Sequence, residues 1–222
     1  MDFKKTVIVL SGGMDSAVLL ADTLAKGYDT AAISFDYGSK HNARELPMAV
    51  SMCKHSNIRH KIVNLPFIND LFSSSLLQSG DEIPDGHYAA QNMQSTVVPF
   101  RNGILMSIAV GLAESMKADR VLLGSHAGDH FIYPDCRPEF NAAFAQAALL
   151  GTDWQVSVRF PFAEIDKRNI GDLGRRLGVD FKQTWTCYKG GERHCGTCGA
   201  CQERRYALRK EEGLDPTDYE TC

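Results

Sequence analysis

The sequence predicts a doubly wound α/β fold, in which five parallel strands form one sheet and helices cover both of its faces. Two observations support this fold class. Short apolar segments rich in β-branched residues alternate with longer segments of helical periodicity, as expected when each parallel strand is followed by a crossover helix. A cysteine-rich segment, residues 187–201, follows the last of these units and indicates a small C-terminal lobe. Ligands of doubly wound sheets bind at the carboxyl ends of the strands.

Each predicted strand is a short apolar run bounded by polar or glycine residues. The first run, Val7 to Leu10, is followed at once by a glycine turn. Continuous apolar character over a few residues is typical of a strand that is buried on both faces of a parallel sheet. The predicted strands are residues 6–10, 30–35, 61–65, 120–124 and 156–160.

The predicted helices carry apolar residues three and four positions apart, most clearly over residues 102–116. Gly27 suits a helix C-terminus, and Pro138 suits a first helical turn. Pro47 is compatible with its helix only in the first turn, because proline lacks an N–H group. The predicted helices are residues 17–26, 42–55, 102–116, 138–150 and 170–177.

Residues 66–98 show neither the pattern of a buried strand nor the periodicity of a helix, and they are rich in serine, glycine and proline. We expect an irregular segment there, and a loop of that length in a compact domain is usually functional or mobile.

Composition and charge exclude several classes of protein. The 222-residue chain, with 44% hydrophobic and 23% charged residues, is typical of a globular protein whose core needs no disulfides. Its formal net charge of −3 gives no support to a general nucleic-acid-binding protein. No apolar stretch approaches the roughly 20 residues of a membrane span, and the N-terminus lacks the pattern of a signal peptide. We expect a cytoplasmic protein, away from membranes, with reduced cysteines.

The most informative motif lies between the first strand and the first helix, and consists of Ser11, Gly12, Gly13, Met14, Asp15 and Ser16. Glycines let the backbone approach an anion closely. The N–H groups and the dipole of the following helix then bind it, and the serine hydroxyls add donors. The motif is neither the lysine-containing phosphate loop nor the dinucleotide fingerprint. An ordinary strand–helix turn is the alternative interpretation.

A second motif has the spacing C-x7-C-x2-C-x2-C and consists of Cys187, Cys195, Cys198 and Cys201. Zinc binds four thiolates tetrahedrally at about 2.3 Å, and the glycines that follow two of these cysteines permit tight turns. Four filled positions make a structural site rather than a catalytic one. The alternatives are an iron–sulfur cluster, a redox dithiol and a metal-free turn, although the spacing differs from that of bacterial ferredoxins. We predict one structural zinc ion per chain.

The glycine motif resembles the pyrophosphate loop of the ATP pyrophosphatases, which cleave ATP between its α and β phosphates and adenylate an oxygen of the substrate. Further segments narrow the resemblance, namely Phe35 to Gly38, His41 with Glu45, Val98 to Asn102, Gly124 to Asp129, Tyr133 to Phe140 and Thr184 to Tyr188. In this order, and over nearly the whole chain, they resemble the 7-cyano-7-deazaguanine synthase family of queuosine-precursor synthesis. The chain departs from the family at Ser39-Lys40, where Gln-Arg is usual, and within residues 125–128.

The resemblance implies an adenine nucleotide α-hydrolase-like, Rossmann-like body at residues 1–182, which binds ATP, and a zinc-binding lobe at residues 183–222 packed on it. It implies the conversion of 7-carboxy-7-deazaguanine and ammonia to 7-cyano-7-deazaguanine. ATP would activate the carboxylate, ammonia would form an amide, and a second activation would remove the amide oxygen. Mg²⁺ would accompany ATP. The resemblance also implies a homodimer that acts on small molecules and makes no direct contact with nucleic acid.

The resemblance further implies roles for individual residues. ATP would contact the motif and the end of the second strand, through Leu10, Ser11, Gly12, Gly13, Met14, Asp15, Ser16, Ile33 and Phe35. The catalytic candidates are Asp15, Ser16, Arg101 and Asp129. Within this set Asp15 is the candidate magnesium ligand, and Arg101 is the candidate phosphate clamp. The deazaguanine pocket would be formed by Tyr133, Asp135, Cys136 and Arg137.

Simpler interpretations of these residues stay open. Asp15 would also suit a helix cap, and Arg101 would also suit the surface. Asp129 would also suit a loop turn. Cys136 is a possible nucleophile, but a packing role fits better because ATP already supplies a leaving group.

Two other functions share the glycine motif. An ATP-dependent tRNA thiolase, or another adenylating tRNA-modifying enzyme, would need a broad basic face. A non-catalytic nucleotide-binding regulator would bind ATP without turnover and would not need the segment from Tyr133 to Phe140.

Overall fold

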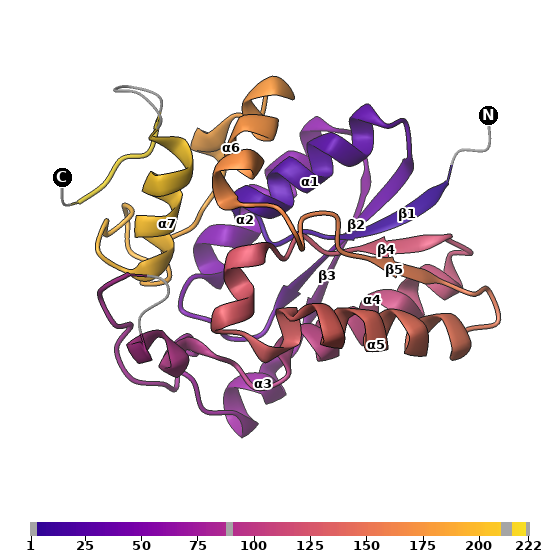
Figure 1. The fold of residues 1–222 in the computed structure, drawn as a ribbon, viewed down its shortest axis with the longest axis horizontal. Helices are drawn as coiled ribbons and strands as arrows, with labels where there is room; N and C mark the ends of the chain where they lie inside the picture. Colours follow the sequence, from indigo (N-terminus) through magenta and orange to yellow (C-terminus); the bar gives the residue numbers. More distant parts are fainter. Residues whose placement is uncertain (1–3, 88–90, 210–214, 221–222) are drawn as a thin grey trace.

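A single parallel sheet forms the centre of the computed structural model, which describes residues 4–87, 91–209 and 215–220 (Figure 1). The strand order is β3-β2-β1-β4-β5, and all four pairings are parallel. The direction of winding reverses between β1 and β4, which is the switch point where doubly wound sheets bind ligands. The strands are β1 (Lys5–Val9), β2 (Asp29–Asp36), β3 (Arg59–Asn64), β4 (Arg120–Leu122) and β5 (Ser157–Arg159). The predicted fold class is confirmed.

Helices cover both faces of the sheet. Helices α1, α2, α6 and α7 lie on one face, and α4 and α5 lie on the other (Figure 1). The α-helices are α1 (Met14–Ala25), α2 (Asn42–His55), α3 (Pro66–Leu71), α4 (Arg101–Ser115), α5 (Pro138–Leu150), α6 (Lys167–Arg176) and α7 (Gly199–Leu208). Short 3-10 helices are η1 (Gln91–Thr96), η2 (Ala127–Phe131), η3 (Pro134–Cys136) and η4 (Phe181–Gln183).

The two faces of β1 divide the core into two hydrophobic clusters. Val7 and Val9 face one cluster, which also contains buried residues of α4. Ile8 faces the other, with residues of α1, α6 and α7. This alternation follows from the two-residue period of a strand, and the burial of both sides explains the continuous apolar sequence.

The structure corrects two expectations about helices. The segment 66–98, expected to be irregular, contains α3 and η1. Helix α3 begins at a proline, which suits the first helical position, and its Ile68 is fully buried. Pro47 lies at the sixth position of α2, beyond the first turn, so α2 tolerates the loss of one hydrogen bond there.

The C-terminal lobe contains α7, a helix that its sequence did not indicate. Arg204 on α7 is only 1% exposed. Its guanidinium donates to the Phe181 carbonyl (2.6 Å) and to the hydroxyls of Thr184 (2.8 Å) and Thr186 (2.9 Å). Because a buried charge is costly unless it is hydrogen-bonded, these contacts hold α7 against the segment that enters the lobe.

One described segment, Gln91–Ser115, has the length and hydropathy of a membrane span, which the sequence was not expected to contain. Half of its most apolar window is buried in the protein. Most of the segment is α4, whose Met106 and Ala109 are fully buried in the core. The core helix of a globular protein passes the same test of length and composition, so this finding is weak evidence for a span.

Candidate active site

A pocket of about 210 Å³ lies at the carboxyl ends of β1, β2 and β4. The ends of these strands contribute Leu10, Phe35 and Leu123, and the glycine motif forms part of the wall. The C-terminal lobe forms another part, through residues such as Trp185 and Glu203. The lobe is therefore a component of the site as well as a neighbour of the sheet.

The glycine motif is packed tightly against the first turn of α2. Gly12 has φ of +98°, and a Cβ atom there would lie 2.1 Å from the carbonyl oxygen of Glu45. Only glycine combines this backbone conformation with so close an approach. The Ser11 hydroxyl accepts from the Gly13 N–H (3.0 Å), and the Ser16 hydroxyl accepts from the Gly12 N–H (3.3 Å). The motif is thus a hydrogen-bonded turn at the N-terminus of α1, suited to an anion.

One half of the pocket, the charged half, gathers acidic and basic side chains around Lys167. The Lys167 ammonium lies 2.5 Å from Asp15 Oδ2, 3.4 Å from Glu203 Oε2 and 3.1 Å from His126 Nε2. Although burial opposes it, the charge of Asp15 and then that of Glu203 raise the pKa of Lys167, so the ammonium stays protonated. The charged half consists of Asp15, His126, Asp129, Lys167 and Glu203.

Asp129 and His126 are linked within the charged half. The Asp129 carboxylate accepts from the backbone N–H of His126 (2.9 Å), and the His126 ring accepts from the N–H of Gly128 (3.0 Å). Burial and Lys167 lower the pKa of His126, but the carboxylates of Asp129 and Glu203 outweigh them and raise it. Asp129 therefore has both of the roles considered for it, a residue of a loop turn and a residue that faces the ligand. Its carboxylate caps η2 and also lines the pocket.

The other half of the pocket, the aromatic half, holds five aromatic side chains and two ionisable ones, Glu45 and Arg101. The Arg101 guanidinium lies 5.9 Å from the ring centroids of both Tyr37 and Tyr133. Glu45 faces the glycine motif, with Oε1 3.3 Å from the position of a Cβ on Gly13. The aromatic half consists of Phe35, Tyr37, Glu45, Arg101, Tyr133, Trp185 and Tyr188.

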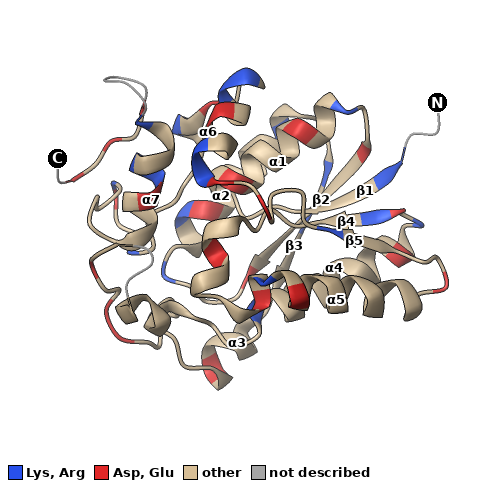
Figure 2. Cartoon of the chain, viewed as in Figure 1, with Lys and Arg blue, Asp and Glu red and all other residues tan. Residues whose placement is uncertain are grey.

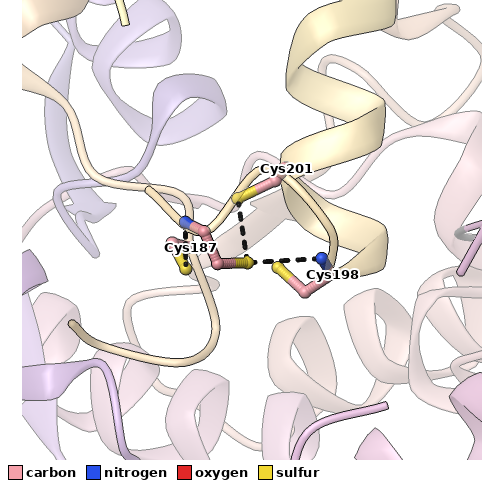
Figure 3. Close-up of side chains that lie close together, drawn as sticks. Cys187, Cys198 and Cys201 are labelled. Atoms are coloured by element: carbon pink, nitrogen blue, oxygen red, sulfur yellow. Dashed lines mark hydrogen bonds between the residues drawn. The ribbon is translucent and has the colours of Figure 1, made fainter. Parts of the chain in front are cut away.

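The four cysteines of the second motif come together in the lobe, and Figure 3 labels three of them, Cys187, Cys198 and Cys201. Their sulfur atoms all lie within 4.8 Å of one another, and the sulfurs of Cys195 and Cys201 are 3.8 Å apart. A tetrahedron with zinc–sulfur bonds of about 2.3 Å has edges of nearly this length. Backbone N–H groups of Thr197 and Cys198 donate to the Cys195 sulfur (3.4 and 3.3 Å). The set fits a zinc ion.

Comparison with known proteins shows where the chain belongs. Residues 5–212 match the family model of the queuosine biosynthesis protein QueC. The chain belongs to the QueC family. A 7-cyano-7-deazaguanine synthase from Desulfotalea psychrophila is 69% identical, over 96% of this chain and 98% of that protein. Another from Porphyromonas gingivalis is 48% identical, over 98% of each.

Solved structures share the fold of this QueC-family chain. The NMN synthetase from Francisella tularensis has a TM-score of 0.52 and 17% identity, over 86% of this chain and 69% of that one. The U34-tRNA thiolase NcsA from Methanococcus maripaludis, solved with its [4Fe-4S] cluster, also has a TM-score of 0.52 and 17% identity, over 81% of this chain and 59% of that one. At such low identity the likeness extends to the fold alone.

The structure brings most of the candidate residues of this QueC-family chain to the pocket, though several lie elsewhere. The residues at the pocket wall are Leu10, Ser11, Gly13, Met14, Asp15, Ser16, Phe35, Arg101, Asp129, Tyr133 and Cys136. Gly12 lies behind them, against α2. Ile33 points into the hydrophobic core on the α4 face of the sheet rather than toward a ligand.

Two candidates for the deazaguanine pocket have other surroundings. Asp135 is buried, and its carboxylate accepts from the backbone N–H of Asn102 (2.7 Å) at the start of α4. Arg137 is exposed and donates to the carbonyl of His130. Cys136 is buried too, and burial raises the pKa of its thiol far above the ordinary range, so the thiol is neutral and unsuited to nucleophilic attack.

Sequence reasoning missed Lys167, Glu203 and the role of Glu45 in the pocket wall. Lys167 could have been found, because it directly follows Asp166, an aspartate of the kind that caps helices. In the structure Asp166 accepts from the N–H of Arg168 (2.8 Å) at the start of α6, which begins beyond β5. Such a cap at the carboxyl end of a strand indicates the ligand edge. Glu203 had none, because α7 itself was not expected.

Proposed function

We propose that this chain is a 7-cyano-7-deazaguanine synthase, as its relatives are named, and that it converts 7-carboxy-7-deazaguanine and ammonia to the nitrile at the expense of ATP. The proposal rests on one observation, a pocket that combines the glycine motif, the charged half and the aromatic half. Membership of the QueC family supports it.

Activation of oxygen is the chemical problem that the pocket would solve. A carboxylate is a poor acyl donor, because an oxide or hydroxide ion would have to leave. Transfer of a nucleotide-derived phosphoryl group to that oxygen makes it a leaving group, which ammonia displaces to form an amide. A second activation, at the amide oxygen, allows that oxygen to leave as the nitrile forms. One site that activates oxygen would serve both steps.

The residues of the charged half would position the phosphates of ATP. The glycine motif offers N–H groups at the start of α1. Lys167 in the charged half and Arg101 in the aromatic half both supply cations to the pocket, and fixed charges of this kind stabilise phosphoryl transfer. Lys167 is already oriented by Glu203 and His126, so little reorganisation is needed.

Asp15 fits a magnesium ligand. Its Oδ2 pairs with Lys167, whereas Oδ1 is buried without a hydrogen-bond partner among the described residues. Mg²⁺ prefers one or two carboxylates together with phosphate oxygens. Bound Mg²⁺ would supply charge neutralisation of the phosphates, and Asp15 and Asp129, which both line the pocket, would hold it. The four-cysteine site would hold a zinc ion with a structural role only, because all four positions are filled.

We also propose a cytoplasmic homodimer, with an ATP-binding body at residues 1–182 and the zinc lobe at residues 183–222. Thiolates that bind zinc must stay reduced, which supports this compartment. The Lys and Arg residues are spread over many elements among acidic ones (Figure 2), which gives no support to the tRNA thiolase alternative.

Mass spectrometry of a reaction with 7-carboxy-7-deazaguanine, ammonium and Mg-ATP tests the proposal. Formation of the nitrile, with the amide rising and falling before it, is the expected result. Consumption of ATP without nitrile would leave an adenylating enzyme with another substrate, and tRNA would then be tested. Binding of ATP with no turnover would favour the regulator.

A further inference from the structure

Four carboxylates line the pocket, and one of them differs from the rest in its surroundings. Asp15 and Glu203 pair with Lys167 (2.5 and 3.4 Å). Asp129 accepts from the backbone N–H of His126 (2.9 Å). Glu45 accepts no hydrogen bond from the described residues. Its ion-pair partner, Nε2 of His41, lies 3.7 Å from Oε2, beyond hydrogen-bonding distance.

The electrostatic surroundings of Glu45 leave its charge poorly compensated. Burial raises the pKa of Glu45 to about 8. The negative charge of Asp15 on α1 adds to this increase, and the positive charge of Arg101 on α4 opposes it. His41 does not compensate as a cation, because burial and Arg101 lower its pKa to about 3 and keep it neutral. An ionised carboxylate that is buried without hydrogen-bond donors costs folding free energy, and a ligand that supplies donors would remove this cost.

The neighbours of Glu45 favour a flat ligand. Five aromatic side chains line this half of the pocket, and the His41 ring packs against that of Tyr188, with the centroids 5.4 Å apart and the ring planes tilted by 36°. Aromatic walls with a few polar groups are typical of sites that bind nucleobases by stacking and read their edges by hydrogen bonds. A carboxylate at such a wall requires a base edge that consists of donors.

We propose that Glu45 determines specificity by accepting hydrogen bonds from the ring N–H and the adjacent 2-amino group of a guanine-like base held in the aromatic half. Two N–H groups that donate to the Glu45 carboxyl would favour its ionised form, which has two acceptor oxygens and no donor and so matches two parallel N–H groups. The pairing edge of adenine presents an acceptor beside its amino group, so the same carboxylate would reject the base of ATP. This inference rests on the proposed function, since it assigns the substrate of that site.

Calorimetry with matched ligands and variants tests this assignment. The ligands are 7-carboxy-7-deazaguanine and the analogue that lacks the 2-amino group, titrated into wild type, Glu45→Gln and the control Glu82→Gln. Glu82 is exposed and lies outside the pocket. We expect Glu45→Gln to bind the 2-amino base about 10- to 100-fold more weakly, because a hydrogen bond to a charged group contributes about 1.5–3 kcal/mol.

The decisive quantity is the discrimination between the two ligands. Wild type and Glu82→Gln should prefer the 2-amino base, and Glu45→Gln should lose that preference while its circular dichroism spectrum and zinc content are kept. Unchanged discrimination in Glu45→Gln would overturn the inference. So would a wild type that binds both ligands equally, whether or not the variant folds. A wild type that binds neither ligand and forms no nitrile would instead contradict the proposed function.

Discussion

At the scale of single residues, the pair formed by Asp15 and Lys167 shows what sequence reasoning can and cannot find. Asp15 lies in a continuous motif of six residues between a predicted strand and a predicted helix, so its position next to a bound anion can be inferred from neighbouring residues. Lys167 is 152 positions away in sequence, so only the sheet topology brings its ammonium to that carboxylate. Asp15 could therefore be predicted as a site residue from the sequence, whereas its ion pair with Lys167 could not.

Replacement of Asp15 by asparagine tests the phosphate side of the pocket. The variant keeps the shape of the side chain but removes the charge that pairs with Lys167 and the oxygen offered to Mg²⁺. We expect ATP consumption to fall by about 10²- to 10³-fold, as is usual when one electrostatic group of this kind is lost. Circular dichroism and zinc content should stay those of wild type. Turnover at the wild-type rate would remove Asp15 from the mechanism.

Glu45 makes stability depend on pH. Its pKa is raised from 4.5 to about 8 in the folded chain, so the folded state binds this proton more tightly than the unfolded state. The resulting contribution to stability is complete below pH 4.5 and is lost as the pH rises through about 8. Glu45→Gln should therefore melt at a higher temperature than wild type at pH 8.5, with a smaller difference at pH 5. Equal melting curves for the two proteins at both pH values would contradict this electrostatic description.

At the scale of elements, the strands and the long helices followed from periodicity, whereas the short and irregular elements did not. Helix α2 has the expected bounds, 42–55, and α5 the expected bounds, 138–150. Helix α7 was missed because its start is defined by Cys198 and the turn of the cysteine motif, and its packing depends on the long-range contacts of Arg204. Glu203, which α7 carries, was missed with it.

Helix α7 links the metal site to the pocket, because it carries both Cys201 and Glu203. Cys198→Ser should release zinc and loosen α7, since metal binding in such a site contributes folding free energy. We expect a lower melting temperature and, in the same variant, weaker binding of Mg-ATP, because Lys167 loses one of its partners. Metal analysis and calorimetry together measure both effects. Normal Mg-ATP affinity in a zinc-free protein would show that the lobe and the pocket are independent.

At the scale of the whole molecule, the fold was predictable because a doubly wound sheet follows from simple repetition of strand and helix, and its ligand edge is fixed by topology. The composition of the pocket was less predictable. Its wall draws on segments from β1 to α7, so the division into a charged and an aromatic half is a property of the assembled chain. Asp135 and Arg137 illustrate the limit, because they adjoin pocket residues in sequence but face Asn102 and the surface.

In the proposed reaction one pocket activates oxygen twice, first on a carboxylate and then on an amide. The most direct measurement supplies the purified chain with the amide, 7-amido-7-deazaguanine, and Mg-ATP in the absence of ammonium. We expect mass spectrometry to detect the nitrile, formed in proportion to the ATP consumed and abolished by Asp15→Asn. Persistence of the amide, in a preparation that still converts the carboxylate to the amide, would contradict the claim and show that nitrile formation needs another site.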